Sequence, residues 1–205
     1  MNPHLDATVT DGRVARRVGT REVILAAATE LFAARGVTST SIDDIAEKAG
    51  IAKGSIYYNF GSKAGLVEAV LGEHSALLKQ LLAEATAGLA GPARRAAVVT
   101  ALLQAIRSHA DAARVMVTEM FRTERSWLES IEAWRSIIQG SLTDDFLAEH
   151  PDSSPALASV QAATIIGAAL TAGLDWLAFN PELPLENVRD AVLRTLGLPG
   201  EPGGR

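Results

Sequence analysis

Residues 40–66 read TSIDDIAEKAGIAKGSIYYNFGSKAGL, and this run alone predicts two short helices. Thr40 and Ser41 each precede an acidic residue by three positions, which is the spacing of a capping box at a helix start. Apolar residues then recur at helical spacing until Gly50, a residue type that commonly ends helices. A second helix is expected over Lys53–Phe60, with Gly61 as its end.

Two short helices joined by a turn at a glycine are typical of a helix-turn-helix, whose second helix enters the DNA major groove. The second helix carries groups that suit this task. Lys53, Ser55, Tyr57, Tyr58 and Asn59 offer hydrogen bonds to phosphates or base edges. The geometry alone is a weak signal, because such turns are common in helical proteins.

The rest of the chain keeps a period near 3.6 residues and shows no alternation long enough for a strand. We expect an all-α fold of about nine helices, with an N-terminal three-helix domain followed by a larger helical domain. Beyond residue 53 the helices are expected near 53–60, 63–90, 93–110, 112–124, 126–149, 154–179 and 185–196. The first helix should begin near Thr20 and end before Gly36.

Charge is distributed unevenly along a chain whose net charge is −5. Residues 1–65 hold eight Lys or Arg against seven Asp or Glu, and residues 66–205 hold eleven against seventeen. Residues 12–21 and 48–67 contain cations and no acid, which favours contact with a polyanion, although such runs are often only solvated surface. With no cysteine, the chain has no disulfide, thiolate metal site or cysteine nucleophile.

The order of residues between 20 and 66 closely resembles the N-terminal domain of the TetR family of transcriptional regulators. The positions that carry the resemblance are Thr20-Arg21, Ile24-Leu25, Ala27-Ala28, Leu31-Phe32, Gly36, Thr40-Ser41-Ile42, Asp44-Ile45-Ala46, Ala49-Gly50-Ile51, Lys53-Gly54, Tyr57, Phe60, Ser62-Lys63 and Leu66. The resemblance implies a homodimeric, ligand-responsive DNA-binding protein, most often a repressor. It divides the chain into a flexible basic arm (1–19), a DNA-binding domain (20–62), a regulatory and dimerisation domain (63–198, with a connecting helix at 63–90) and a disordered tail (199–205).

The family pattern also implies which residues contact a double-stranded operator. They are Thr40, Ser41, Lys53, Gly54, Ser55, Tyr57, Tyr58 and Lys63. Asn59 stands where the family commonly has histidine, and Phe60 is expected in the core. Tyr57 has the alternative interpretation of a packed core aromatic, and Arg13, Arg16 and Arg17 that of a solvated tail instead of an arm on DNA.

Two further sites are expected in the larger domain. Polar and aromatic residues within apolar stripes predict a pocket for a small-molecule effector, lined by His74, His109, Met116, Met120, Trp127 and Trp134. Small and apolar residues of the last two helices predict the dimer interface at Gly167, Leu170, Leu174, Val188 and Val192. Ordinary core packing within one chain explains either set equally well.

Other functions fit the sequence less well. The acidic pairs Asp43-Asp44 and Asp144-Asp145 point about 100° apart on a helix and do not converge on one substrate atom. We expect no enzyme activity and no cofactor or metal. A helical protein-interaction adaptor is the alternative function. The apolar run 162–174 is shorter than the roughly 18 residues of a membrane span, so no membrane segment is expected and the protein is predicted to be cytoplasmic and nucleoid-associated.

Overall fold

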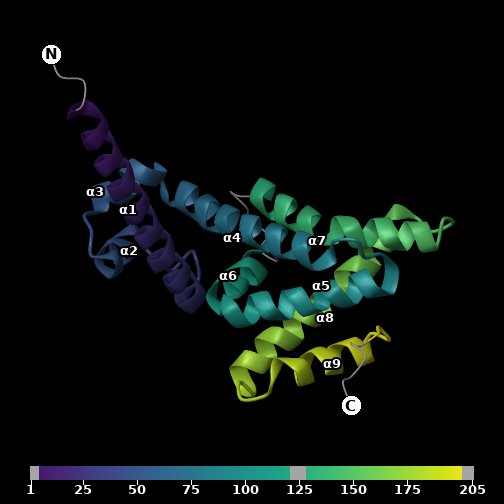
Figure 1. Ribbon diagram of the computed structural model, residues 1–205. Coiled ribbons are helices and arrows are strands. Elements are labelled where there is room, and N and C mark those ends of the chain that lie inside the picture. Colours follow the sequence, from purple (N-terminus) through teal and green to yellow (C-terminus); the bar gives the residue numbers. More distant parts are fainter. Residues whose placement is uncertain (1–4, 121–127, 200–205) are drawn as a thin grey trace. The chain divides into compact units, whose positions relative to one another are not determined.

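The computed structural model describes the backbone of residues 5–120 and 128–199, and these ranges contain nine α-helices and no strand (Figure 1). The prediction of an all-α fold is confirmed. The helices are α1 (Leu5–Arg35), α2 (Ile42–Ala49), α3 (Lys53–Phe60), α4 (Lys63–Thr86), α5 (Gly91–Ser108), α6 (Ala110–Met120), α7 (Leu128–Glu149), α8 (Pro155–Phe179) and α9 (Leu185–Thr195). Side chains are described outside residues 5–18, 120, 128–131, 133, 134 and 138.

Helix α1 begins at Leu5, well before the start predicted near Thr20. The predicted flexible arm, residues 1–19, is therefore helical from Leu5 onward. No proline occurs between residues 5 and 35, and alanine and arginine are frequent there, so nothing in the backbone chemistry stops the helix at Thr20. The side chains of Arg13, Arg16 and Arg17 lie outside the described residues.

The chain divides into two compact units, residues 1–70 and 71–205, and the division falls inside α4. The division lies within the helix that was expected to connect the two domains, eight residues after the boundary predicted at residue 62. Leu66, Val67 and Val70, in the first two turns of α4, are fully buried and belong to the first unit. Their burial explains why the first unit extends into this helix.

The first unit has a small apolar core to which each helix contributes. Ile24 and Phe32 of α1, Ile45 of α2, Ile56 of α3 and Leu66 of α4 are all buried. Gly50 takes the left-handed conformation, with φ of 66°, and its N–H donates to the carbonyls of the last turn of α2. A side chain is strained in that conformation, so glycine permits the abrupt change of direction between α2 and α3.

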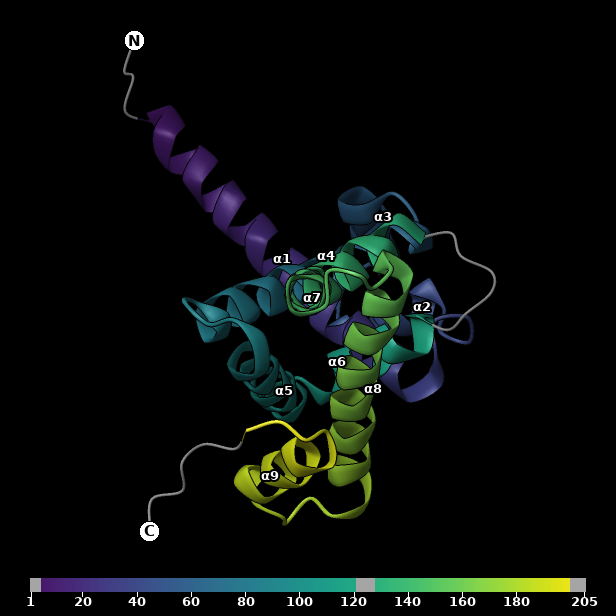
Figure 2. The same cartoon turned by 90° about the vertical axis from the view of Figure 1, so that its right-hand side faces the viewer.

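The second unit is a bundle of helices α5 to α9 together with the later part of α4. Helix α8 packs against both α7 and α5, and α9 lies across α5 and the end of α8 (Figure 2). Buried side chains from these helices include Leu102, Leu103, Leu142, Ile166 and Leu193. Helices that pack against several neighbours in this way can form the walls of a cavity within the second unit.

Helix α8 covers the predicted range 154–179 to within one residue, and it is apolar over more of its length than the run 162–174. It has 25 residues, and its most apolar window has a mean hydropathy of 1.6, so length and composition alone would allow it to cross a membrane. A core helix meets the same criteria, and α8 is packed against α5 and α7. About 39% of that window is buried within the chain, which leaves much of an apolar helix uncovered.

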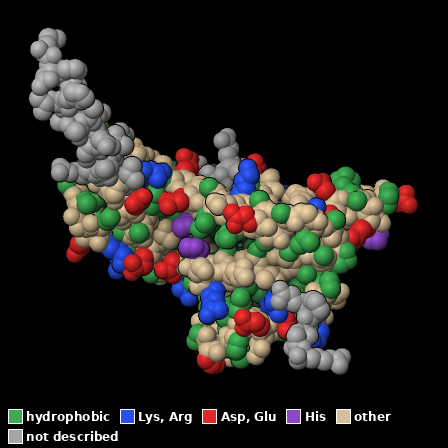
Figure 3. Space-filling view, viewed as in Figure 1, with side chains coloured by type: hydrophobic (Ala, Val, Ile, Leu, Met, Phe, Trp, Pro, Cys, Tyr) green, Lys and Arg blue, Asp and Glu red, His purple; other side chains and the backbone are tan. Residues whose placement is uncertain are grey.

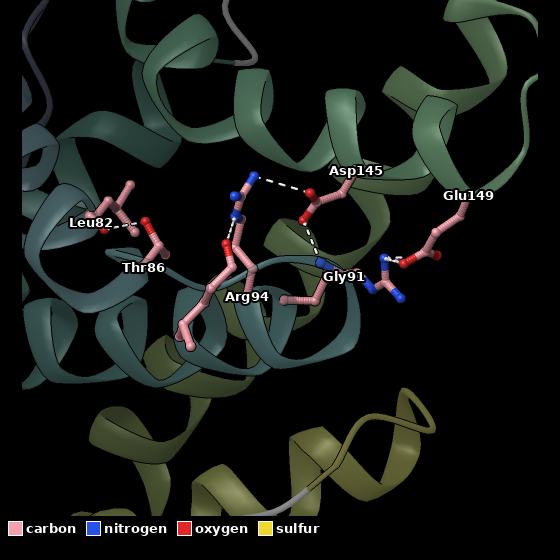
Figure 4. A network of polar contacts seen from close by, with 8 residues as sticks. Leu82, Thr86, Gly91, Arg94, Asp145 and Glu149 are labelled. Carbon is pink, nitrogen blue, oxygen red and sulfur yellow. Dashed lines mark hydrogen bonds and ion pairs between the residues drawn. The ribbon is translucent and has the colours of Figure 1, made fainter.

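Polar contacts between α5 and α7 fix the start of α5 (Figure 4). Asp145 accepts hydrogen bonds from the N–H of Gly91 at 3.1 Å and from Nη1 of Arg94 at 3.0 Å. Nearby, Arg95 donates to both oxygens of Glu149 at 2.9 and 3.0 Å. The positive charges of Arg94 and Arg95 near the start of α5 are unfavourable at the positive end of the helix dipole. The carboxylate of Asp145 offsets this positive charge and accepts from one of the N–H groups that have no partner within the helix.

Replacing Asp145 by alanine should lower the free energy of unfolding of the second unit by about 2 kcal/mol, because a backbone N–H and a guanidinium both lose their acceptor. The matched control is Asp144→Ala, which removes the neighbouring exposed carboxylate and should change stability by less than about 0.5 kcal/mol. Urea unfolding followed by tryptophan fluorescence measures both, since all three tryptophans lie beyond residue 70. Equal midpoints for the two variants would contradict the assigned role of Asp145.

Candidate nucleic-acid interface and ligand cavity

Helix α3 is attached to the first unit through one fully buried side chain and presents two tyrosines outward. Ile56 is 0% exposed, whereas Tyr57 is 46% and Tyr58 74% exposed. Gly54 is exposed too, and open space surrounds the point where its side chain would stand. Tyr57 is therefore not a core aromatic, and the helix offers two phenols and an open stretch of backbone on its outer side.

The cation of α3 is held by an acid of α2. Nζ of Lys53 donates to Oδ2 of Asp43 at 2.9 Å, and both side chains are largely exposed. This hydrogen bond raises the pKa of Lys53 above its ordinary value. An exposed ion pair is weak, so a phosphate can replace the carboxylate of Asp43 as the partner of Lys53.

The start of α2 is a capping box, as predicted, but only Ser41 belongs to it. The hydroxyl of Ser41 accepts from the N–H of Asp44 at 3.1 Å, and the carboxylate of Asp44 accepts from the N–H of Ser41 at 2.7 Å. The hydrogen bonds from the hydroxyl and the N–H of Ser41 lower the pKa of Asp44. Ser41 is exposed and stands at the positive end of the α2 dipole.

Thr40 requires a correction, because its side chain faces the interior. The residue is 1% exposed, and its hydroxyl lies 2.9 Å from the carbonyl of Gly36 and 3.3 Å from that of Leu31. A side chain used in this way does not reach DNA. Thr40 holds the end of α1 to the start of α2. The sequence pattern alone could not distinguish this structural role from a contact with a phosphate.

The remaining predicted contacts lie at the two ends of α3 and the start of α4. Ser55 and Lys63 are half-buried, and Nζ of Lys63 donates to the carbonyl of Thr38 at 3.3 Å. Asn59 donates to the carbonyl of Ser55 at 2.7 Å, which gives it a role within the helix. Phe60 is half-buried instead of fully buried as expected, and the guanidinium of Arg21 lies 5.4 Å from the centre of its ring.

An apolar cavity in the second unit brings together part of the predicted effector site. Its volume is about 60 Å³, and His74 of α4, His109 at the end of α5 and Met116 of α6 all line it. Trp127 and the side chains of Met120 and Trp134 lie outside the described residues. The other lining residues are hydrocarbon, among them Leu78, Leu102, Ile106 and Leu170, residues that the sequence did not connect with the pocket.

The predicted dimer residues divide between the inside and the outside of the second unit. Leu170, Val188 and Val192 are buried within the chain, because the same apolar side chains that suit an interface also fill the core. Gly167 is exposed and Leu174 is half-buried. The exposed side of α8 carries instead a stripe of small and apolar residues at helical spacing: Val160, Ala163, Thr164, Gly167 and Thr171.

Comparison with known proteins agrees with this arrangement. The family model described as bacterial regulatory proteins, tetR family, matches residues 24–70. Over 136 residues, 62% of this chain and 67% of the relative, the sequence is 31% identical to the HTH-type transcriptional repressor KstR2 of Rhodococcus jostii strain RHA1. The chain belongs to the TetR family. The resemblance found in residues 20–66 is thereby confirmed, and relatives of this kind are regulators and not enzymes.

Other relatives match shorter stretches of this TetR-family chain. The HTH-type transcriptional regulator SrpR of Pseudomonas putida is 37% identical over 89 residues, which are 43% of this chain and 40% of the relative. The chain thus spans less than half of that relative. Two solved structures share the fold: FadR from Bacillus subtilis in complex with stearoyl-CoA (TM-score 0.67, 18% identity, 85% and 96% covered) and FadR from Bacillus halodurans (TM-score 0.70, 16% identity, 90% and 99% covered).

Thr40→Val should lower the free energy of unfolding by about 1 to 2 kcal/mol, because the carbonyl of Gly36 loses its donor. The affinity for a duplex should stay unchanged at a temperature where the variant is folded. Circular dichroism in urea and a fluorescence DNA-binding titration measure the two quantities, with the exposed Ser39→Ala as control. Unchanged stability together with weaker DNA binding would return Thr40 to the interface.

Proposed function

We propose that this TetR-family protein is a cytoplasmic, nucleoid-associated transcriptional repressor that binds a palindromic operator as a homodimer and leaves it when a small molecule binds. The observation that carries the proposal is the outward presentation of Lys53, Tyr57 and Tyr58 on a helix held by buried Ile56. A helix in the major groove needs exposed hydrogen-bonding side chains on one side and an anchor on the other.

The proposed DNA contacts follow from the side chains' positions. Tyr57, Lys63 and the start of α2 at Ser41 contact phosphates, which position the protein on the duplex. Tyr58, the most exposed large side chain of α3, and Ser55 reach toward base edges. Gly54 allows the backbone to approach because no side chain stands there.

The proposed dimer uses the exposed stripe of α8. Small residues such as Ala163 and Gly167 let a second helix approach closely, and a two-fold axis matches a palindrome with half-sites one helical turn apart or a multiple. Burying this stripe against a second copy removes from water an apolar helix that the chain itself leaves uncovered. Engaging both half-sites raises the overall affinity.

The proposed effector site is the cavity that His74, His109 and Met116 line. The relative KstR2 is a transcriptional repressor. The structural neighbour FadR from Bacillus subtilis is a transcriptional regulator whose structure contains stearoyl-CoA. Helix α4 runs from Lys63 to His74 and beyond, so a ligand that favours one position of α4 changes the DNA affinity by its differential binding. Such coupling is typically about 1 to 3 kcal/mol.

Lys63→Ala should weaken binding to specific and random duplexes alike, and should reduce the slope of log K against log salt by about one unit, as expected for one lost phosphate contact. Lys79→Ala, an exposed lysine further along the same helix, is the control and should leave the slope unchanged. Fluorescence anisotropy at several salt concentrations gives both slopes. If the parent protein shows no salt-dependent binding to a duplex, the alternative function of a protein-interaction adaptor would be favoured.

Gly167→Arg should convert the dimer to a monomer without destabilising the fold. The position is exposed, nothing lies within 4 Å of a Cβ placed there, and an arginine would block the approach of a second α8. Gly140→Arg is the control, because Gly140 is equally exposed and open but lies on α7. Sedimentation velocity measures the masses. A dimeric Gly167→Arg variant would place the interface elsewhere.

A further inference from the structure

Two imidazoles belong to the lining of one hydrocarbon cavity. His74 of α4 is half-buried and His109, which follows α5, is exposed, and both line the same space of about 60 Å³. Histidine side chains lie together on the face of the molecule shown in Figure 3. The other lining residues are apolar: Leu77, Leu78, Leu81, Leu102, Ala105, Ile106, Ala112, Ala113, Met116 and Leu170. The polar side chains of the lining are thus two imidazoles, each of which can donate a hydrogen bond.

The charges around the two imidazoles are few. Burial lowers the pKa of His74 below its ordinary value, and the nearby His109 lowers it further, whereas Glu73 opposes both. On α6, the charges of Asp111 and Arg114 are paired with each other at 3.3 Å, outside the lining. No carboxylate lines the cavity among the residues that the structure describes. From α8, Leu170 contributes to the wall without a charge.

An anion is the ligand that this lining recognises best. A cationic group would enter an apolar space without a carboxylate to pair it, which is costly. A metal ion normally takes three or more protein ligands, and the described residues contain no cluster of three ligating side chains. A dianion such as a phosphate would bring two charges into a space that is otherwise lined by hydrocarbon. A single negative charge on an apolar body matches both parts of the lining.

We propose that the cavity binds an apolar monocarboxylic acid, with His74 and His109 donating hydrogen bonds to its carboxylate and the hydrocarbon walls enclosing its tail. The inference deepens the proposed function, since it names the chemical class of the effector, and it rests on the cavity being the effector site. At its present volume the cavity encloses the carboxylate and a few carbon atoms, so a longer tail extends through the opening or widens the walls.

The proposed site makes binding depend on pH in a defined direction. A carboxylate between the imidazoles favours their protonated forms, so binding takes up a proton when the pH lies above the pKa of the free site. An alkanoate stays ionised between pH 6 and pH 8, so the change comes from the protein. Affinity should therefore fall as the pH rises, by at most about tenfold per pH unit for one proton.

The first experiment compares carboxylates with neutral molecules of the same shape. Isothermal titration calorimetry of the full chain at pH 6 and pH 8 uses straight-chain alkanoates from butanoate to decanoate, together with the matching primary amides. We expect one alkanoate or more to bind about tenfold tighter than its amide at pH 6, because a hydrogen bond between charged groups is lost in the amide. We expect this preference to shrink at pH 8.

The second experiment assigns the effect to the two histidines. Histidine-labelled protein followed by NMR during a pH titration should show that the alkanoate raises the pKa of His74 and His109 and leaves that of exposed His150 unchanged. His74→Gln and His109→Gln should each weaken the pH dependence, and the double variant should remove it, while the fold is kept. His150→Gln is the matched control and should bind as the parent does.

The outcomes separate this inference from the proposed function. Equal affinity for acid and amide, no alkanoate binding at all, or binding that leaves both imidazole pKa values unchanged would each overturn the carboxylate site. DNA binding and dimerisation, measured on the same preparations, are unaffected by any of these results. If the parent chain does not bind DNA, the proposed function would be overturned, and the calorimetric result on the cavity would still hold.

Discussion

The attachment of α3 through Ile56 is the constraint on which the exposed surface of the first unit depends. This helix has eight residues and only Ile56 is fully buried, so Lys53, Tyr57 and Tyr58 are exposed. The capping box at Ser41 fixes the start of α2 and Gly50 fixes its end, and only three residues separate α2 from α3. A short helix on its own is unstable, and packing on the core supplies the stability that propensity does not.

The second unit shows how a few polar groups are placed within hydrocarbon for different purposes. Asp145 meets an N–H and a guanidinium, so its charge is satisfied within the chain and serves to hold α5 against α7. His74 and His109 stand instead at a cavity whose remaining wall is apolar. A buried charge is costly unless it is paired, which is why the contacts of Asp145 stabilise the chain itself.

Several positions show where sequence patterns lose their power. Thr40 matches a cap and a phosphate contact equally well, and only its burial against the end of α1 decides between core and surface. Leu170, Val188 and Val192 are apolar residues that would suit a dimer interface, yet all three are buried within a single chain. The start of α1 at Leu5 was missed because a favourable N-cap at Thr20 does not compel a helix to begin there.

Local chemistry was enough to determine the helical class, the ends of α2 and α3 and the outward position of Lys53 and Tyr57. Those features depend on hydrogen bonds and apolar spacing within a few residues, which a single segment contains. Tertiary structure alone decided which apolar residues of α8 face the core, which histidines share a cavity and where the first unit ends within α4. These depend on contacts between segments far apart in the chain, and no local pattern records which face meets which neighbour.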